Sequence, residues 1–180
     1  MWETLFKRYW QVTILKESPE NTPYSPLLMI VASFLFFSLI ILQWDLADIK
    51  EEFDFGTSVL AGLTLLCSYF VYTYVLLKIY RKVERTLQTL TALLVSHLII
   101  HFFAFPLLFV TPVLVAADMN RALVLGVGIA YLIITLTLTI WQLWVTIFIY
   151  KQALEMDYLT AILASFGLLS CNILTVSFWQ

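Results

Sequence analysis

The two histidines of the chain, His97 and His101, are the side chains whose type and spacing best suit chemistry. They lie four residues apart in a long apolar run, so a helix would carry both imidazoles on one face. Such a pair can form one edge of a metal site. The sequence has no third histidine, its apolar runs contain no Asp or Glu, and Cys67 and Cys171 are far apart. We therefore expect no metal or cofactor, and a metal or haem carrier ranks as the third alternative.

Hydrogen bonding to polar side chains of other helices is the simplest role for these histidines. Gln142 and Asn172 lie in other apolar runs at broadly similar depths, so they are candidate partners. An ionisable side chain inside a membrane segment is also a functional hypothesis in its own right. His97, His101, Gln142 and Asn172 therefore form the predicted intramembrane polar site.

Signatures of catalysis and of coupled transport are missing from the sequence. It contains no G-x-S-x-G, H-E-x-x-H, P-loop, glycine-rich dinucleotide turn or C-x-x-C motif. Ser96 adjoins His97, but neighbours on a helix point about 100° apart and are poorly placed to bond each other. Coupled transporters usually keep an Asp or Glu inside the helix bundle. We predict a protein that is neither an enzyme nor a coupled transporter.

Composition places the chain in a membrane. Of its 180 residues 62% are hydrophobic and 12% are charged, and the mean hydropathy is +0.92. Soluble domains have about half apolar and a quarter charged residues. The net charge of -2 argues against a nucleic-acid partner, because phosphate binding needs a basic face. The lipid bilayer is the partner that composition itself predicts.

The hydropathy pattern predicts an all-α, polytopic bundle of five transmembrane helices. None of the predicted spans contains Asp, Glu, Lys or Arg, and they cover residues 26–44, 57–77, 86–110, 122–150 and 158–179. Ser25 and Pro26 suit the cap and the first helical position of the first span. Residues 1–24 form a separate N-terminal segment ahead of a transmembrane domain of residues 25–180. Its residues 1–16 predict a short amphipathic helix at the membrane interface, with a helix packed on the loops as the alternative.

Basic residues predict the orientation of the spans, because Lys and Arg in short loops stay in the cytoplasm. The densest cluster joins the second and third spans and consists of Lys78, Arg81, Lys82 and Arg85. Only two basic residues, Lys50 and Arg121, fall on the opposite side. The N-terminus is therefore predicted inside and the C-terminus outside. The same cluster could bind anionic headgroups.

Small residues at four-residue steps predict where helices approach one another. Ala122, Gly126 and Ala130 form such a stripe in the fourth span, and Ser58 with Gly62 repeats the spacing in the second. Lipid gives helices no hydrophobic reason to associate, so small residues that let backbones approach are the main packing signal. We assign both stripes to packing within one bundle rather than to dimerisation.

The stretch SPENTPYSPLL before the first span, RTLQTLTALL opening the third and the five-span layout resemble a group of small inner-membrane proteins of Gram-negative bacteria. The layout is more loosely similar to Yip1-type five-span membrane proteins, which are linked to membrane trafficking and partner binding. This resemblance implies a bacterial inner-membrane location, a periplasmic C-terminus and a compact helical bundle. It transfers no activity to particular residues.

The expected function is that of a non-enzymatic accessory, assembly or scaffold factor, which acts through helix contacts with a membrane protein partner or in a homo-oligomer. Charge-free spans and small-residue faces leave helix contact as the main available activity. The alternative is a small uncoupled transporter or channel that uses the polar residues of spans three to five.

Overall fold

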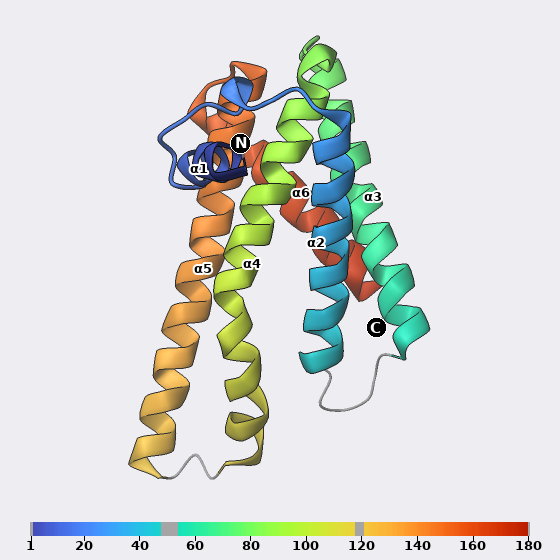
Figure 1. Ribbon diagram of the computed structural model, residues 1–180. Coiled ribbons are helices and arrows are strands. Elements are labelled where there is room, and N and C mark those ends of the chain that lie inside the picture. Colours follow the sequence, from blue (N-terminus) through green and yellow to red (C-terminus); the bar gives the residue numbers. More distant parts are fainter. Residues whose placement is uncertain (1, 48–53, 118–120, 180) are drawn as a thin grey trace.

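Helices make up all the regular structure that the computed structural model describes, in residues 2–47, 54–117 and 121–179 (Figure 1). The long helices are α2 (Pro26–Ala47), α3 (Phe55–Ile79), α4 (Thr86–Ala116), α5 (Ala122–Leu154) and α6 (Tyr158–Ser177). Each is long and apolar enough to cross a membrane. The predicted all-α bundle with five spans is confirmed. Shorter elements are α1 (Trp2–Thr13), η1 (Pro19–Asn21) and η2 (Val83–Arg85).

Polar side chains start three of the long helices. The Leu28 amide donates to Ser25 Oγ at 3.3 Å, which confirms the predicted cap, and Pro26 is the first residue of α2. Asp54 Oδ1 accepts from the Thr57 amide at 2.8 Å, and Asp157 Oδ2 accepts from the Thr160 amide at 3.2 Å. Each cap satisfies an amide that has no partner within its helix.

Helices α2 to α5 run past the predicted span limits, most clearly α4, whereas α6 ends at Ser177, short of the predicted residue 179. We expected the third span to end at residue 110 and a connection to follow, but α4 continues to Ala116 with Pro106 and Pro112 inside it. Apolar residues follow Pro112 without a turn signal, and a helix is the only way for such a segment to satisfy its backbone in lipid. α5 likewise continues to Leu154 and α2 to Ala47.

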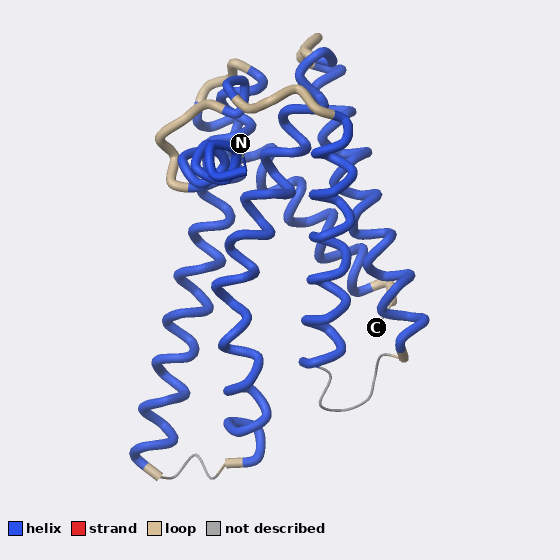
Figure 2. The backbone as a smooth tube through the Cα atoms, viewed as in Figure 1, coloured by secondary structure: helices blue, strands red, loops and turns tan. Residues whose placement is uncertain are grey.

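α4 lies at the centre of the arrangement. It packs against α2 on one side and α5 on the other, while α6 packs against α3 and α5 (Figure 1). Figure 2 shows the chain N-terminus near one end of the bundle, with the connections η1 and η2, and the C-terminus toward the other. We call the end with η1 and η2 the inner end and the opposite one the outer end.

α1 lies across α4 and α5. Its Tyr9, Val12 and Thr13 are buried, and the Trp10 ring contacts Phe103 at 6.1 Å and Trp141 at 6.4 Å between centroids. Trp141 Nε1 also donates to the Thr13 carbonyl at 3.0 Å. α1 therefore packs on the long helices and not only on loops. Its depth in a bilayer stays a prediction.

Burial divides α4 and α5 into two parts. Toward the inner end, Leu93, Val145 and Tyr150 are fully buried in a core that all the long helices share. Toward the outer end, residues 105–116 of α4 and 122–135 of α5 pair with each other and leave most of their apolar side chains exposed. We call these two segments the outer hairpin. α2 ends at Ala47, about one turn after Gln43, which bonds His101, so the hairpin extends well beyond α2.

Candidate functional site

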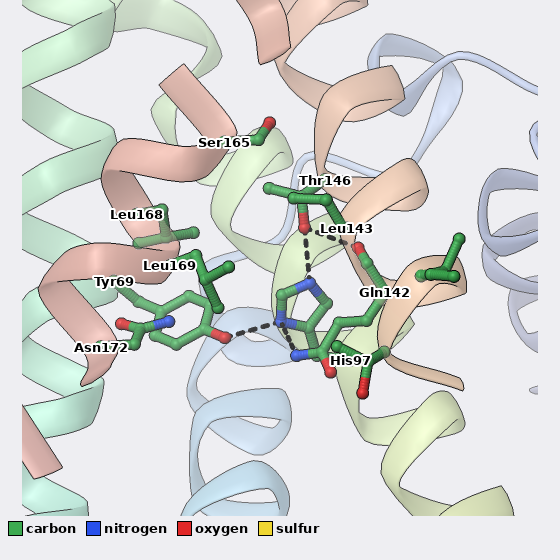
Figure 3. A pocket seen from close by; sticks show the side chains of 11 residues that line it. Tyr69, His97, Gln142, Leu143, Thr146, Ser165, Leu168, Leu169 and Asn172 are labelled. Carbon is green, nitrogen blue, oxygen red and sulfur yellow. Dashed lines mark hydrogen bonds between the residues drawn. The ribbon is translucent and has the colours of Figure 1, made fainter. Parts of the chain in front are cut away.

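His97 is the centre of a buried polar network that joins α3, α4 and α5 (Figure 3). Its side chain is 2% exposed. Nδ1 lies 2.7 Å from Tyr69 Oη and 3.3 Å from Gln142 Nε2, and Nε2 lies 2.9 Å from Thr146 Oγ1. Each of these partners comes from a helix other than α4, so the network fixes how α3 and α5 sit against it.

The hydrogen-bond directions define the tautomer of His97. Thr146 Oγ1 gives its proton to the Gln142 carbonyl at 2.9 Å, so it must accept from His97 Nε2–H. Nδ1 then carries the lone pair and accepts from the Tyr69 hydroxyl and from the Gln142 amide. A neutral imidazole is thereby satisfied at both nitrogens, which a buried polar group requires.

His101 faces a different partner, Gln43 of α2. Gln43 Nε2 donates to the His101 carbonyl at 3.0 Å, which fixes the amide orientation, because a carbonyl can only accept. Gln43 Oε1 therefore accepts from His101 Nδ1–H at 2.8 Å. The Phe36 ring packs edge-on against the imidazole with centroids 5.9 Å apart. His101 thus carries its lone pair on Nε2, which has no hydrogen-bond partner in the described part of the chain.

Two cavities meet at this network. The smaller has a volume of about 120 Å³ and is lined by His97, Thr146 and Ser165 together with apolar residues of α5 and α6 (Figure 3). The larger, of about 350 Å³, is lined by His101 and Ser177 together with apolar and aromatic residues of α2, α3 and α6. Tyr69, Gln142 and Asn172 line both cavities, so the two are neighbours.

Asn172 joins the site from α6. Ser68 Oγ of α3 donates to Asn172 Oδ1 at 2.7 Å, which leaves the Asn172 amide N–H groups for the cavities. In Figure 3 the Asn172 side chain lies beside the Tyr69 ring. All five spans therefore contribute a polar side chain to this region. Gln43 of α2 lies at one edge, and Asn172 of α6 lies at the other.

The structure brings the four predicted site residues to one region but divides them among three hydrogen-bonded groups. His97 bonds Gln142, as expected, whereas His101 bonds Gln43 and Asn172 bonds Ser68. Sequence reasoning missed Gln43, Tyr69, Ser68 and Thr146. Gln43 and Tyr69 carried a usable signal, because each is a polar group within an apolar run. The hydroxyls gave none, because Ser and Thr in such helices commonly bond their own backbone.

The donor set does not fit a metal ion. Within the described ranges no group of three or more His, Cys, Asp or Glu side chains could hold one. The lone pair of His97 already accepts two hydrogen bonds, so only His101 Nε2 could serve as a ligand. Cys67 is exposed and Cys171 half-buried, both as free thiols.

The basic cluster at the inner end is partly neutralised within the protein. Lys82 Nζ lies 2.7 Å and Arg85 Nη2 2.6 Å from the Glu155 carboxylate, and Arg85 Nη1 lies 2.7 Å from Glu20. Hydrogen bonds and charge from Lys82 and Arg85 hold the pKa of Glu155 below its ordinary value. Of the predicted cluster, Lys78 and Arg81 stay exposed, so only part of it can meet headgroups.

The two small-residue stripes have different surroundings. Ser58 is buried, and a Cβ added at Gly62 would lie 3.0 Å from the Phe37 ring of α2, so this stripe packs within the bundle as predicted. Ala122, Gly126 and Ala130 are exposed in the outer hairpin. A Cβ at Gly126 would meet nothing within 4 Å in the described residues, so the contact predicted there within the bundle is not formed.

No family model, curated protein or solved structure matches the chain. The resemblance to five-span inner-membrane proteins therefore stays a prediction.

Proposed function

We propose that this protein is a non-enzymatic accessory factor of a membrane that acts by packing its outer hairpin against another transmembrane helix. The observation that carries this proposal is the open face of α5 at Gly126, where an added Cβ would meet nothing within 4 Å in the described residues. Glycine in a helix interior costs about 1 kcal/mol relative to alanine, so a glycine on an open face gains nothing within the monomer. Close backbone approach by a second helix supplies a reason for it.

A second copy of this chain is the occupant we expect on that face. Ala122, Gly126 and Ala130 repeat at the four-residue step that lets two identical helices cross closely about a two-fold axis. The outer hairpin extends beyond α2, so a second hairpin could reach it without displacing the rest of the bundle. Exposed apolar side chains around the stripe, such as Leu123 and Ile129, would complete the contact.

Cysteine cross-linking in native membranes tests this contact. In a background with Cys67 and Cys171 replaced by alanine, Gly126→Cys should form a disulfide dimer under mild oxidation. Leu132→Cys is the matched control, because Leu132 is exposed on the same helix about a third of a turn away from the stripe. A Gly126→Leu variant should convert the dimer to a monomer in mild detergent and leave the fold intact.

The outcomes separate the possible occupants. A dimer that survives Gly126→Leu would contradict the assigned face. A different protein recovered in stoichiometric amount, and lost in Gly126→Leu, keeps the accessory function but replaces the second copy as occupant. A monomer of the wild-type protein in every mild detergent, without cross-linking in membranes, would overturn the proposal.

Our proposed location is the inner membrane of a bacterium, with the N-terminus in the cytoplasm and the C-terminus in the periplasm. Support comes from the basic residues Lys78, Arg81, Lys82 and Arg85, which share the inner end with the N-terminal helix (Figure 1). Alkaline phosphatase fused after Gln180 should be active, because this enzyme works only after export. Inactivity of that fusion, with activity of one inserted after Lys82, would reverse the orientation.

The alternative function, an uncoupled transporter or channel that uses the polar site, has less support than a site that only binds a molecule. The smaller cavity reaches His97, whereas Leu77, Leu93 and Tyr150, closer to the inner end, are fully buried. None of these three residues lines either cavity. An uncoupled transporter would need this core to open, whereas a binding site needs only the cavities that exist.

A further inference from the structure

The larger cavity is lined by His101, whose Nε2 is a hydrogen-bond acceptor without a partner in the described part of the chain. Gln43 Oε1 accepts from His101 Nδ1 at 2.8 Å and so fixes the neutral tautomer that has its lone pair on Nε2. Side-chain polar atoms that are fully enclosed and without a partner, among the described residues, are Tyr9 Oη and Thr135 Oγ1. His101 Nε2 is not one of them, and His101 lines the cavity. A molecule in the cavity can therefore reach this lone pair.

The remaining polar groups of the cavity are uncharged and of mixed character. Asn172 keeps amide N–H donors after its Oδ1 accepts from Ser68, and Gln142 keeps its Oε1 after its amide donates to His97. Both residues line the cavity with His101. The lining contains no Asp, Glu, Lys or Arg among the described residues, so a charged headgroup would have no counter-charge.

Apart from Ser177 of α6, the rest of the lining is apolar and aromatic. Phe36 and Ile40 of α2, Leu65 of α3 and Ile173 and Val176 of α6 form these walls. The volume of about 350 Å³ falls within the range of small-molecule sites, which extends from about 300 to 1,000 Å³. Walls of this kind suit an alkyl chain, which would lie among the spans with its polar end at His101.

We propose that the larger cavity binds a neutral amphiphile with a hydroxyl head, which donates its proton to His101 Nε2. A hydroxyl has one donor and two acceptor sites, so it can also accept from an amide such as that of Asn172. An ether or a ketone only accepts and would leave the His101 lone pair unpaired. A carboxylate would bring a charge into a site without a cation. This proposal is independent of the helix contact proposed for the outer hairpin.

A pair of isomers isolates the hydroxyl. Decan-1-ol and 1-methoxynonane have the same atoms, but only the alcohol can donate. Each would compete with a decan-1-ol derivative that carries a diazirine in its chain, and the cross-linked residues of the purified full-length protein would be mapped by mass spectrometry. Labelling should fall on the cavity walls, and the alcohol should compete about 5- to 10-fold better than the ether, the ratio expected for one neutral hydrogen bond.

Two variants locate that preference. His101→Phe keeps an aromatic ring against Phe36 but removes the acceptor, so the alcohol-to-ether ratio should fall to about one while the affinity for the ether is retained. Gln43→Met removes the partner that fixes the tautomer and leaves the imidazole in place. Its ratio should also fall, because Nε2 can then carry the proton and donate to either isomer. A merely structural role of Gln43 would lower the affinity for both isomers equally.

The results test separately whether the larger cavity binds an amphiphile and whether it prefers a hydroxyl head. Equal competition by the two isomers in the wild-type protein would overturn the hydroxyl assignment and leave an apolar site. Labelling that avoids the cavity walls would overturn the site itself. Diacylglycerol lipids and free long-chain alcohols share the hydroxyl, and competition by dioleoylglycerol but not by its methyl ether would assign the site to the lipid. An alcohol preference without competition by dioleoylglycerol assigns it to a free alcohol.

Discussion

The inner core and the outer hairpin consist of the same two helices, α4 and α5, yet their surroundings are opposite. In the inner core Leu93 and Val145 are fully buried, whereas in the outer hairpin Val113 is 65% and Leu123 78% exposed. Both regions are almost entirely apolar. Apolar composition therefore does not decide where these helices pack.

Polar contacts between helices mark the difference. In the inner half, Tyr69, His97 and Thr146 join three helices, and Thr73 bonds Tyr150 at 2.9 Å. In the outer hairpin the described residues form such a contact between Thr111 and Tyr131, at 3.1 Å. Lipid tails cover an apolar helix face as well as another apolar helix does. Hydrogen bonds and close packing between helices therefore decide which helix faces meet.

Replacing His97 with leucine should give the largest loss of stability. The change leaves the Tyr69 hydroxyl and Thr146 Oγ1 without their partner in a buried region, at about 1 to 3 kcal/mol for each group. We expect a total of about 2 to 5 kcal/mol, measured by unfolding in mixed micelles. His101→Leu loses only one side-chain partner and should cost less. Equal losses would show that the network does not hold the core.

Two glycine substitutions compare the regions directly. A Cβ at Gly167 would lie 2.9 Å from Tyr72 Cζ and closer still to Oη, which donates to the Ala164 carbonyl at 2.7 Å. Gly167→Ala should therefore destabilise the protein by about 1 to 3 kcal/mol, as overpacking does. Gly128→Ala has nothing within 4 Å and should be neutral or slightly stabilising. Unfolding of both variants under one set of conditions gives the comparison, and a neutral Gly167→Ala would contradict the packing of α3 on α6.

A threonine pair offers a finer test on α5 itself. Thr146 Oγ1 accepts from His97, while Thr137 is exposed and, among the described residues, bonds only the Ile133 carbonyl of its own helix. Thr146→Val should cost about 1 kcal/mol, the usual scale for a hydrogen bond between membrane helices. Thr137→Val should be within about 0.5 kcal/mol of the wild type. Similar losses of stability in the two variants would show that the hydrogen bond between Thr146 and His97 does not set the inner core apart from the exposed part of α5.

The inner-end ion pairs should give the smallest effect, and one that depends on pH. Lys82 and Arg85 lower the pKa of Glu155 below its ordinary 4.5 in the folded protein. The stabilisation by these pairs is therefore present above pH 4.5 and is lost as the pH falls through the lower folded pKa. The melting temperatures of wild type and Glu155→Gln should differ slightly at pH 6 and converge at lower pH. A difference that grows on acidification would reverse the assigned sign.

Much of the fold could be predicted because the signals are local. Span number and the first cap depend on hydropathy runs and on Ser25 with Pro26, and both agree with the structure. The predicted end of the third span at residue 110 was wrong, because the helix continues through Pro112 to Ala116 in an apolar stretch. The stripe at Ser58 and Gly62 was predicted correctly, whereas Gly126 has no neighbour in the described chain.

The sequence by itself determined the class of protein, its five spans and the polar residues inside them, because each depends on the composition of one segment. Only the tertiary structure decided the partners: His97 with Tyr69 and Thr146, and His101 with Gln43. Pairing between helices depends on rotation and depth, and an apolar pattern on all sides of a helix specifies neither. The free lone pair of His101 and the open face at Gly126 follow from that pairing, so they emerge only in three dimensions.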